Sequence, residues 1–157
     1  MKKTVLILVL LCLFLQGCAS PAELLSYREK DVSFTVSVTG GGQPYTARVE
    51  LFGGSPARMT FLSPSEAEGM TVRSEGGITY VGCGVEIPLK EEQGGALSAL
   101  LRVMSSLPRD VVTAYKAEFD GIEVYRCETA DGSVFISAET GKPVGFSAGD
   151  VTATVSG

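Results

Sequence analysis

Unbroken alternation between residues 32 and 39 is the feature that most constrains how this chain folds. Every second side chain there is apolar, and each one between is a serine or threonine; the apolar set is Val32, Phe34, Val36 and Val38. Successive side chains of a β-strand point to opposite faces, so a period of two predicts a strand with one buried face. Residues 45–51 repeat the pattern after Gly40-Gly41-Gly42. The segment therefore predicts an antiparallel pair whose apolar face must be covered.

Strand signals continue to the end of the chain. Short runs rich in β-branched and aromatic residues lie between glycine, proline and aspartate turns. The further strands that we expect cover residues 58–62, 70–74, 78–81, 85–89, 111–119, 122–129, 134–138 and 151–155. Asp120-Gly121 is a two-residue hairpin signal, and Gly76-Gly77 is a second candidate turn. About ten antiparallel strands in meander order predict a mainly β (α+β) domain that curls around its own core or is covered by helices.

Two segments predict helices instead. Ser20-Pro21-Ala22-Glu23 combines an N-cap, a proline at the first helical position and the glutamate of a capping box, so a short helix should run to about Glu29. Between residues 95 and 107 the apolar side chains recur at helical spacing. They are Leu97, Leu100, Leu101, Met104 and Leu107. This stripe predicts an amphipathic helix that Pro108 ends.

The N-terminus has the pattern of an export signal. Lys2-Lys3 precede an uncharged apolar run from Thr4 to Leu15, which is shorter than the roughly 20 residues of a membrane-spanning helix. Leu15-Gln16-Gly17-Cys18 then resembles the lipobox of bacterial lipoproteins. An ordinary signal peptide is the alternative, but it would need a small residue where Leu15 stands.

The lipobox resemblance implies cleavage between Gly17 and Cys18. Residues 1–17 would be a signal peptide, and residues 18–157 one domain carrying diacylglycerol, with or without an N-acyl chain, on Cys18. The protein would then be extracytoplasmic and anchored to the outer face of the cell membrane, or to the outer membrane in a host that has one. Two or more acyl chains hold a protein stably on a bilayer.

The net charge of residues 18–157 limits the kinds of binding partner that we expect. Loss of Lys2 and Lys3 leaves 11 basic against 18 acidic residues, a net charge of −7. No lysine or arginine cluster occurs, which argues against nucleic acid. Anionic lipid should repel such a domain, so the anchor alone is expected to hold it at the membrane.

Two cysteines, Cys83 and Cys127, remain once Cys12 leaves with the signal peptide and Cys18 takes the lipid. They either form a disulfide or lie buried as free thiols, since the compartment permits both. A metal site is not expected, because the chain has no histidine and two isolated cysteines make no zinc pattern.

Catalysis is not expected either. Hydrolytic triads lack their histidine, and the chain contains no nucleophile elbow and no phosphate-binding loop. The paired carboxylates Glu66/Glu68 and Glu91/Glu92 are explained more simply as solvated loop or surface charges. We therefore expect a non-enzymatic protein without a cofactor beyond its covalent lipid.

The mature segment resembles the lipoprotein-carrier superfamily (LolA, LolB and RseB-like proteins). The likeness lies in a strand ending in Ser63-Pro64, a following Gly69-Met70-Thr71-Val72 step, the Gly77-Ile78-Thr79-Tyr80 step, and a late strand and turn over residues 134–143. It implies a half-open barrel whose concave face holds acyl chains, with residues 95–107 as lid or plug. The chain departs from the carriers proper in its shorter length and its lack of tryptophan.

Two functions follow and stay open. In the first, the concave face and the helix enclose an acyl chain or lipoprotein lipid; the residues expected to line that cavity are Phe34, Val36, Val49, Leu51, Met59, Phe61, Leu97, Leu100, Leu101 and Met104. In the second, the same side chains fill a core, and the protein is an interaction or sensory module that docks on an envelope protein.

Overall fold

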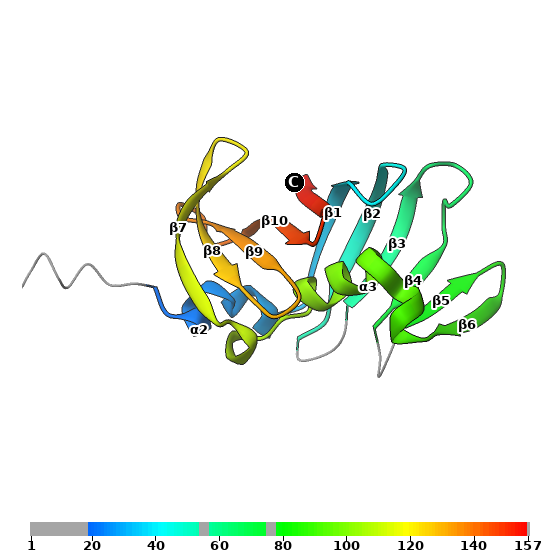
Figure 1. Cartoon of the computed structure of the whole chain (residues 1–157), viewed down its shortest axis with the longest axis horizontal. Coiled ribbons are helices and arrows are strands. Elements are labelled where there is room, and N and C mark those ends of the chain that lie inside the picture. Colours follow the sequence, from blue (N-terminus) through cyan, green and yellow to red (C-terminus); the bar gives the residue numbers. More distant parts are fainter. Residues whose placement is uncertain (1–18, 54–56, 75–77, 157) are drawn as a thin grey trace, which may run out of the picture.

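The computed structural model describes residues 19–53, 57–74 and 78–156, and these form one antiparallel sheet with helices on one side (Figure 1). Its eleven strands are β1 (Val32–Thr39), β2 (Tyr45–Leu51), β3 (Ala57–Ser63), β4 (Thr71–Arg73), β5 (Ile78–Gly82), β6 (Val85–Leu89), β7 (Thr113–Phe119), β8 (Ile122–Glu128), β9 (Ser133–Ser137), β10 (Pro143–Ala148) and β11 (Val151–Ser156). The helices are α2 (Pro21–Leu24), the 3-10 helix η1 (Ser26–Glu29), α3 (Glu91–Met104) and the 3-10 helix η2 (Pro108–Asp110). The mainly β prediction is confirmed.

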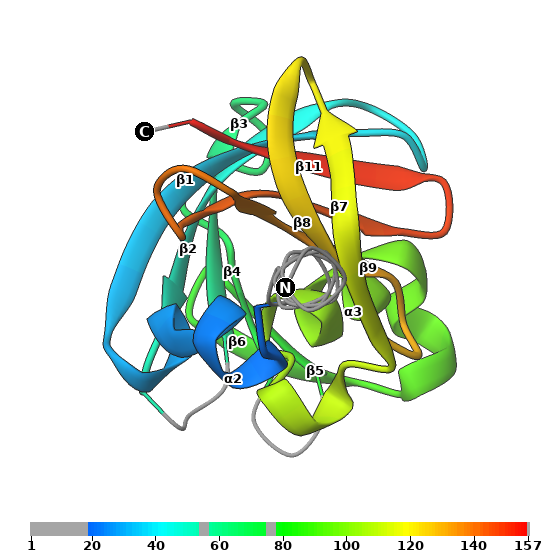
Figure 2. The same cartoon turned by 90° about the vertical axis from the view of Figure 1, so that its left-hand side faces the viewer.

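The strand order is β6-β5-β4-β3-β2-β1-β11-β10-β9-β8-β7. Each half is a meander, as predicted, and the pairing of β1 with the last strand β11 joins the two halves. The strands β6 and β7, consecutive in the sequence, lie at opposite edges, so the sheet curls without closing (Figure 2). The chain between these edges is α3 and η2, which places α3 across the hollow of the sheet.

The strand registry places apolar side chains opposite one another, so that they form one continuous band across the concave face. Val36 lies opposite Ala47 on one neighbour and Val155 on the other. Val49 lies opposite Met59, which lies opposite Val72. The C-terminal half continues the band in the ladder Ala153, Phe146, Val134 and Cys127. The alternation read from the sequence thus becomes a single face of the sheet, and that face is the core.

Helix α3 covers this band and packs mainly on β10, with further contacts to β3, β5, β6 and β9. Leu100, Leu101, Val103 and Met104 are completely buried. The predicted start at residue 95 coincides with a backbone break at Gly95, and the predicted end at residue 107 was wrong. The helix already begins at Glu91, with a backbone break at Gly95, where φ is +49°, and it ends at Met104. Leu107 therefore lies outside the helix.

The N-terminal capping box is confirmed. The Glu23 amide donates to Ser20 Oγ (3.3 Å), and the Ser20 amide donates to Glu23 Oε2 (2.9 Å). The hydrogen bonds to Ser20 lower the pKa of the Glu23 carboxyl. The predicted helix to Glu29 is instead a short α-helix followed by a 3-10 turn, which together bury Leu24, Leu25 and Arg28.

One strand, β10, was not predicted, so the expected count of about ten was one short. Its alternation is broken, because a bulge lies between Pro143 and Gly145. Gly145 also brings no side chain of its own: an added Cβ would lie 2.4 Å from the Phe119 ring. The candidate turn Gly76-Gly77 lies outside the described residues.

Candidate hydrophobic binding site

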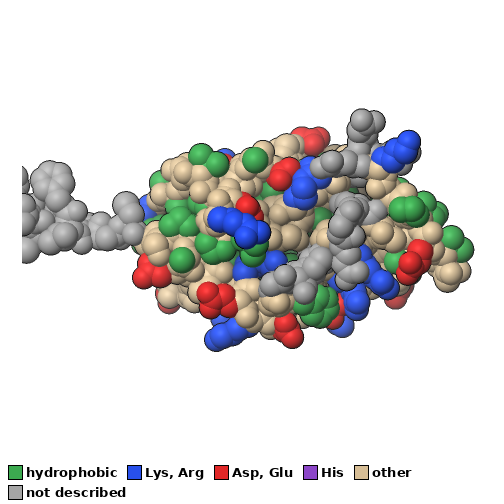
Figure 3. Space-filling view, turned by 90° about the horizontal axis from the view of Figure 1, so that it is seen from below, with side chains coloured by type: hydrophobic (Ala, Val, Ile, Leu, Met, Phe, Trp, Pro, Cys, Tyr) green, Lys and Arg blue, Asp and Glu red, His purple; other side chains and the backbone are tan. Residues whose placement is uncertain are grey.

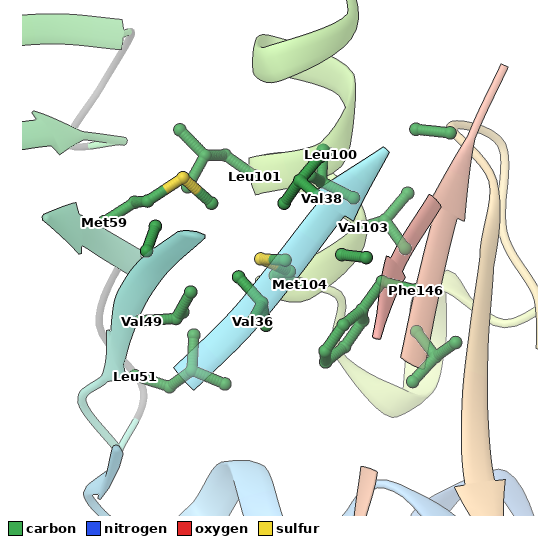
Figure 4. Packing of buried hydrophobic residues seen from close by; sticks show 14 of the residues in the cluster. Val36, Val38, Val49, Leu51, Met59, Leu100, Leu101, Val103, Met104 and Phe146 are labelled. Atoms are coloured by element: carbon green, nitrogen blue, oxygen red, sulfur yellow. The ribbon is translucent and has the colours of Figure 1, made fainter. Parts of the chain in front are cut away.

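The ten predicted cavity residues come together on the concave face. Eight are buried: Val36, Val49, Leu51, Met59, Phe61, Leu100, Leu101 and Met104. Phe34 and Leu97 are half-buried and pack against the same cluster from its rim. Figure 4 shows Val36 and Met104 in the middle of the cluster, with Met59 toward one side and Phe146 toward the other. The residues predicted to line a cavity thus share one face, and ligand binding there stays a prediction.

The C-terminal half of the sheet supplies side chains that the sequence analysis did not include. These are Val134, Ile136, Phe146, Ala148, Val151 and Ala153, all buried in the same cluster. Phe34 stacks on Phe146 with ring centroids 5.7 Å apart. The i, i+2 spacing of Val134 and Ile136, and of Val151 and Ala153, indicated that each pair shares one face of a strand. Only the pairing of β1 with β11 brings these residues to the same face as Phe34.

The side chains that meet beneath α3 are aliphatic, aromatic or thioether. Met59 and Met104 are flexible and polarizable, so they can adjust to irregular apolar shapes. At the rim, Tyr45 packs on Phe61 with centroids 5.1 Å apart, and burial raises the pKa of the Tyr45 hydroxyl to about 12. Such a surface can hold hydrocarbon through burial and dispersion, whereas acid–base chemistry would need titratable groups aimed into it.

One ion pair links α3 to the sheet, and a second polar contact of the same arginine lies within the helix. Arg102 Nε lies 2.8 Å from Asp131 Oδ1 in the turn between β8 and β9, and Arg102 Nη1 donates to Ser98 Oγ (2.8 Å). The pair is partly exposed, which limits its contribution to stability. It holds α3 in register over β9 and β10 without placing a charge in the apolar layer.

A buried arginine lies at the C-terminal end of α3. Arg28, from η1, is 3% exposed, and its Nη2 donates to the Ser105 carbonyl oxygen (3.4 Å). Burial lowers the pKa of Arg28 and raises that of the neighbouring Tyr27 hydroxyl. A cation at a helix C-terminus is favourable, because the last carbonyls point toward it. Arg28 was not identified in the sequence, where one arginine in a polar segment carries no distinguishing signal.

The two cysteines do not form the disulfide that was one of the two predicted alternatives. Both thiols are free: Cys83 is exposed in the β5–β6 turn, and Cys127 is buried in β8. The other alternative, two buried thiols, is right for Cys127 and wrong for Cys83. Burial raises the pKa of the Cys127 thiol to about 11, so it behaves as a small apolar core residue.

Among the described residues, no three His, Cys, Asp or Glu side chains are grouped so that they could hold a metal ion. In the same part of the chain, no helix has the length and apolar character needed to cross a bilayer. Cys18 and Gly17, the predicted lipidation and cleavage residues, lie outside the described residues.

No protein-family model and no curated protein matches this sequence. The structure is similar to an uncharacterized conserved protein from Thermus thermophilus, with a TM-score of 0.53, 12% sequence identity, and coverage of 86% of this chain and 82% of that one. A LolA superfamily protein from Nitrosomonas europaea is also similar, with a TM-score of 0.43, 10% identity, and coverage of 82% and 72%. At these identities the likeness concerns the fold alone.

Proposed function

We propose that this protein is a lipid-anchored extracytoplasmic lipoprotein that binds a hydrophobic ligand, an acyl chain or a lipoprotein lipid, between α3 and the concave face of its sheet. The observation that carries the proposal is the apolar band that runs across an unclosed sheet under a single helix. Apolar ligand sites are concave surfaces lined mainly by hydrophobic side chains.

The way α3 is attached supports the proposal. The chain breaks from helical geometry at Gly95, just before the apolar stripe begins at Leu97. Near the C-terminal end of α3, Arg28 and the Arg102–Asp131 pair hold the helix. A helix secured at its C-terminal end and broken at its N-terminal end can lift from the sheet around Leu97. Half-buried Leu97 and Phe34 then mark the rim through which a chain would pass.

A fluorescent fatty acid titrated into residues 19–157 tests the binding site. This segment contains every described helix and strand and the whole described core. Leu97→Glu puts a carboxylate on the rim and should weaken binding at least several-fold, since it repels the ligand headgroup and resists burial. Leu62→Glu is the matched control at an exposed leucine of β3 and should leave binding unchanged. Equal affinities for both variants, with both shown to be folded by thermal melting, would refute the site.

The lipobox supports the anchoring part of the proposal. Cys18→Ser removes the thiol that would carry diacylglycerol and should release the protein from membranes or leave it unprocessed. Full membrane retention with undiminished lipid labelling of the variant would refute the anchor.

An envelope-protein docking module is the second candidate, and the exposed apolar side chains of edge strand β6 favour it. Val85 and Ile87 project from a strand that has a neighbour on one side only. Exposed edges of this kind accept an added strand, although Pro88 lacks the amide that such pairing would use. Failure of the fatty-acid titration, together with loss of a cross-linked membrane partner in Ile87→Asp, would favour this function.

A further inference from the structure

The point at which the chain enters the domain is fixed by packing. Ala19 contacts the core cluster, and the capping box at Ser20 and Glu23 holds the next turn. Leu24 and Leu25 are buried directly behind it. Residue 18 is one peptide unit, about 3.8 Å between Cα atoms, from Ala19. A lipid on Cys18 would therefore begin almost at the domain surface, with no linker between them.

The surface around this point carries exposed apolar side chains. Helix α2 packs on η2, which leads through Val111 into the edge strand β7. Val112 is 79% exposed, the highest value among the large exposed hydrophobic residues of the described chain, and Tyr115 is 44% exposed. Figure 2 looks onto this end of the molecule, where α2 and β7 lie. Figure 3 shows hydrophobic side chains gathered beside the same exit point.

We infer that this end of the domain, formed by α2, η2 and the start of β7, rests on the lipid bilayer, with Val112 inserted at the boundary between headgroups and acyl chains. The inference rests on the anchoring part of the proposed function and not on the ligand site. An anchor without a linker holds the exit point at headgroup depth, so the surface around it faces lipid. Tyr115 suits the headgroup level, where an aromatic ring with a polar tip is favoured.

The acidic side chains at this end, Glu23 and Asp110, are exposed, so the contact places them at the level of the lipid headgroups. Glu23 is held by the capping box, and Asp110 accepts a hydrogen bond from the Leu107 amide (2.7 Å). Arg109, with an 80% exposed side chain, lies beside Asp110 and can reach lipid phosphates. The domain as a whole is acidic, so general attraction to anionic lipid is not the driving force. The contact should therefore depend on apolar insertion and be insensitive to salt.

The test uses the full chain, matured in bacteria and reconstituted into phosphatidylcholine vesicles, in a Cys83→Ser background. Cys127 is buried, so an environment-sensitive dye attached to Val112→Cys is the accessible label. Ile87→Cys is the matched control, because it is also an exposed β-branched residue but lies on β6 at the far end of the domain (Figure 1). We expect the emission of the dye at position 112 to shift to the blue on vesicle binding. Lipids with a nitroxide near the headgroup should quench this dye several-fold more than the dye at position 87.

The possible outcomes distinguish the membrane-contact surface from the lipid anchor. A lipidated, vesicle-bound protein whose dyes at 112 and 87 are quenched equally would overturn the docking surface and leave the anchor standing. A chain whose mass shows no lipid on Cys18, and which does not bind vesicles, would overturn both. Quenching at 112 that disappears in high salt would also overturn the inference, because the contact would then be electrostatic. The fatty-acid titration reports on the ligand site independently of all three results.

Discussion

Strands β9 and β6 have the same length and belong to the same sheet, yet every residue of β9 is buried and four of the five in β6 are exposed. β9 lies between two neighbours, under α3 on one face, and beneath Phe119 on the other, where that ring stacks on Phe135 with centroids 4.2 Å apart. β6 lies at an edge of the sheet and has one neighbour. Burial in this protein is thus set by position in the sheet more than by strand composition, and stability should be concentrated in the half that contains β9.

An aspartate placed in β9 and in β6 should give the largest difference in unfolding free energy. Ile136→Asp puts a carboxylate in the completely buried core of β9 and should cost more than about 4 kcal/mol, enough to unfold a domain of ordinary stability. Ile87→Asp on exposed β6 should change the free energy of unfolding by no more than about 0.5 kcal/mol. Urea denaturation measures both, and comparable losses would show that β6 is covered in solution.

Removal of a large core ring should have the next largest effect. Phe146→Ala deletes a fully buried ring that stacks on Phe34, and it should destabilise the domain by about 3–5 kcal/mol. Val85→Ala on β6 is the exposed counterpart and should be nearly neutral. A loss under about 1 kcal/mol for Phe146→Ala would indicate that the space beneath α3 is not tightly packed around this ring.

The cover on the outer face of β9 can be tested at Gly145. A methyl group there would collide with the Phe119 ring, so Gly145→Ala should cost about 1–3 kcal/mol. Phe119→Ala removes the obstacle, and the double variant should lose less stability than the two single variants together. Strictly additive losses in denaturant titrations would mean that the ring does not lie on Gly145.

The two free thiols show the same contrast between an exposed and a buried site, with a smaller effect on stability. At pH 8 a thiol reagent should modify Cys83 rapidly and Cys127 only as the protein unfolds, because Cys127 is buried and its pKa is raised to about 11. The folded state holds the Cys127 proton more tightly than the unfolded chain, whose thiol pKa is about 8.5. This contribution to stability is therefore present below about pH 8.5 and is lost as the pH rises toward 11. Rapid labelling of both thiols in the native protein would contradict the burial of β8.

Regular periodicity was predictable, and departures from it were not. The alternation of residues 32–39 and 45–51 identified β1 and β2 correctly, and the capping box located α2. β10 was missed, because a bulge and Gly145 erase its period of two. Gly145 lies against the ring of Phe119, which is distant in the sequence, so local patterns cannot reveal this contact.

The candidate site divides in the same way. Its residues from β1, β2, β3 and α3 were identified, since each lies on the apolar side of an amphipathic segment. The contribution of Phe146 and Ile136 depended on the β1–β11 pairing, a contact between the two ends of the chain. Arg28 was missed because its role arises only where η1 meets the end of α3. Local pattern therefore gave the apolar face, while the polar group at its end required the tertiary structure.

Native mass spectrometry of residues 19–157, purified from bacteria and ionised gently, tests the central claim most directly. We predict a population with the added mass of one fatty acid or lipid, either co-purified or taken up from added palmitate. Leu97→Glu should diminish this population, and Leu62→Glu should leave it unchanged. A bare mass in every preparation, with no uptake of added fatty acid by the folded protein, would contradict the account and show that the side chains beneath α3 fill a core.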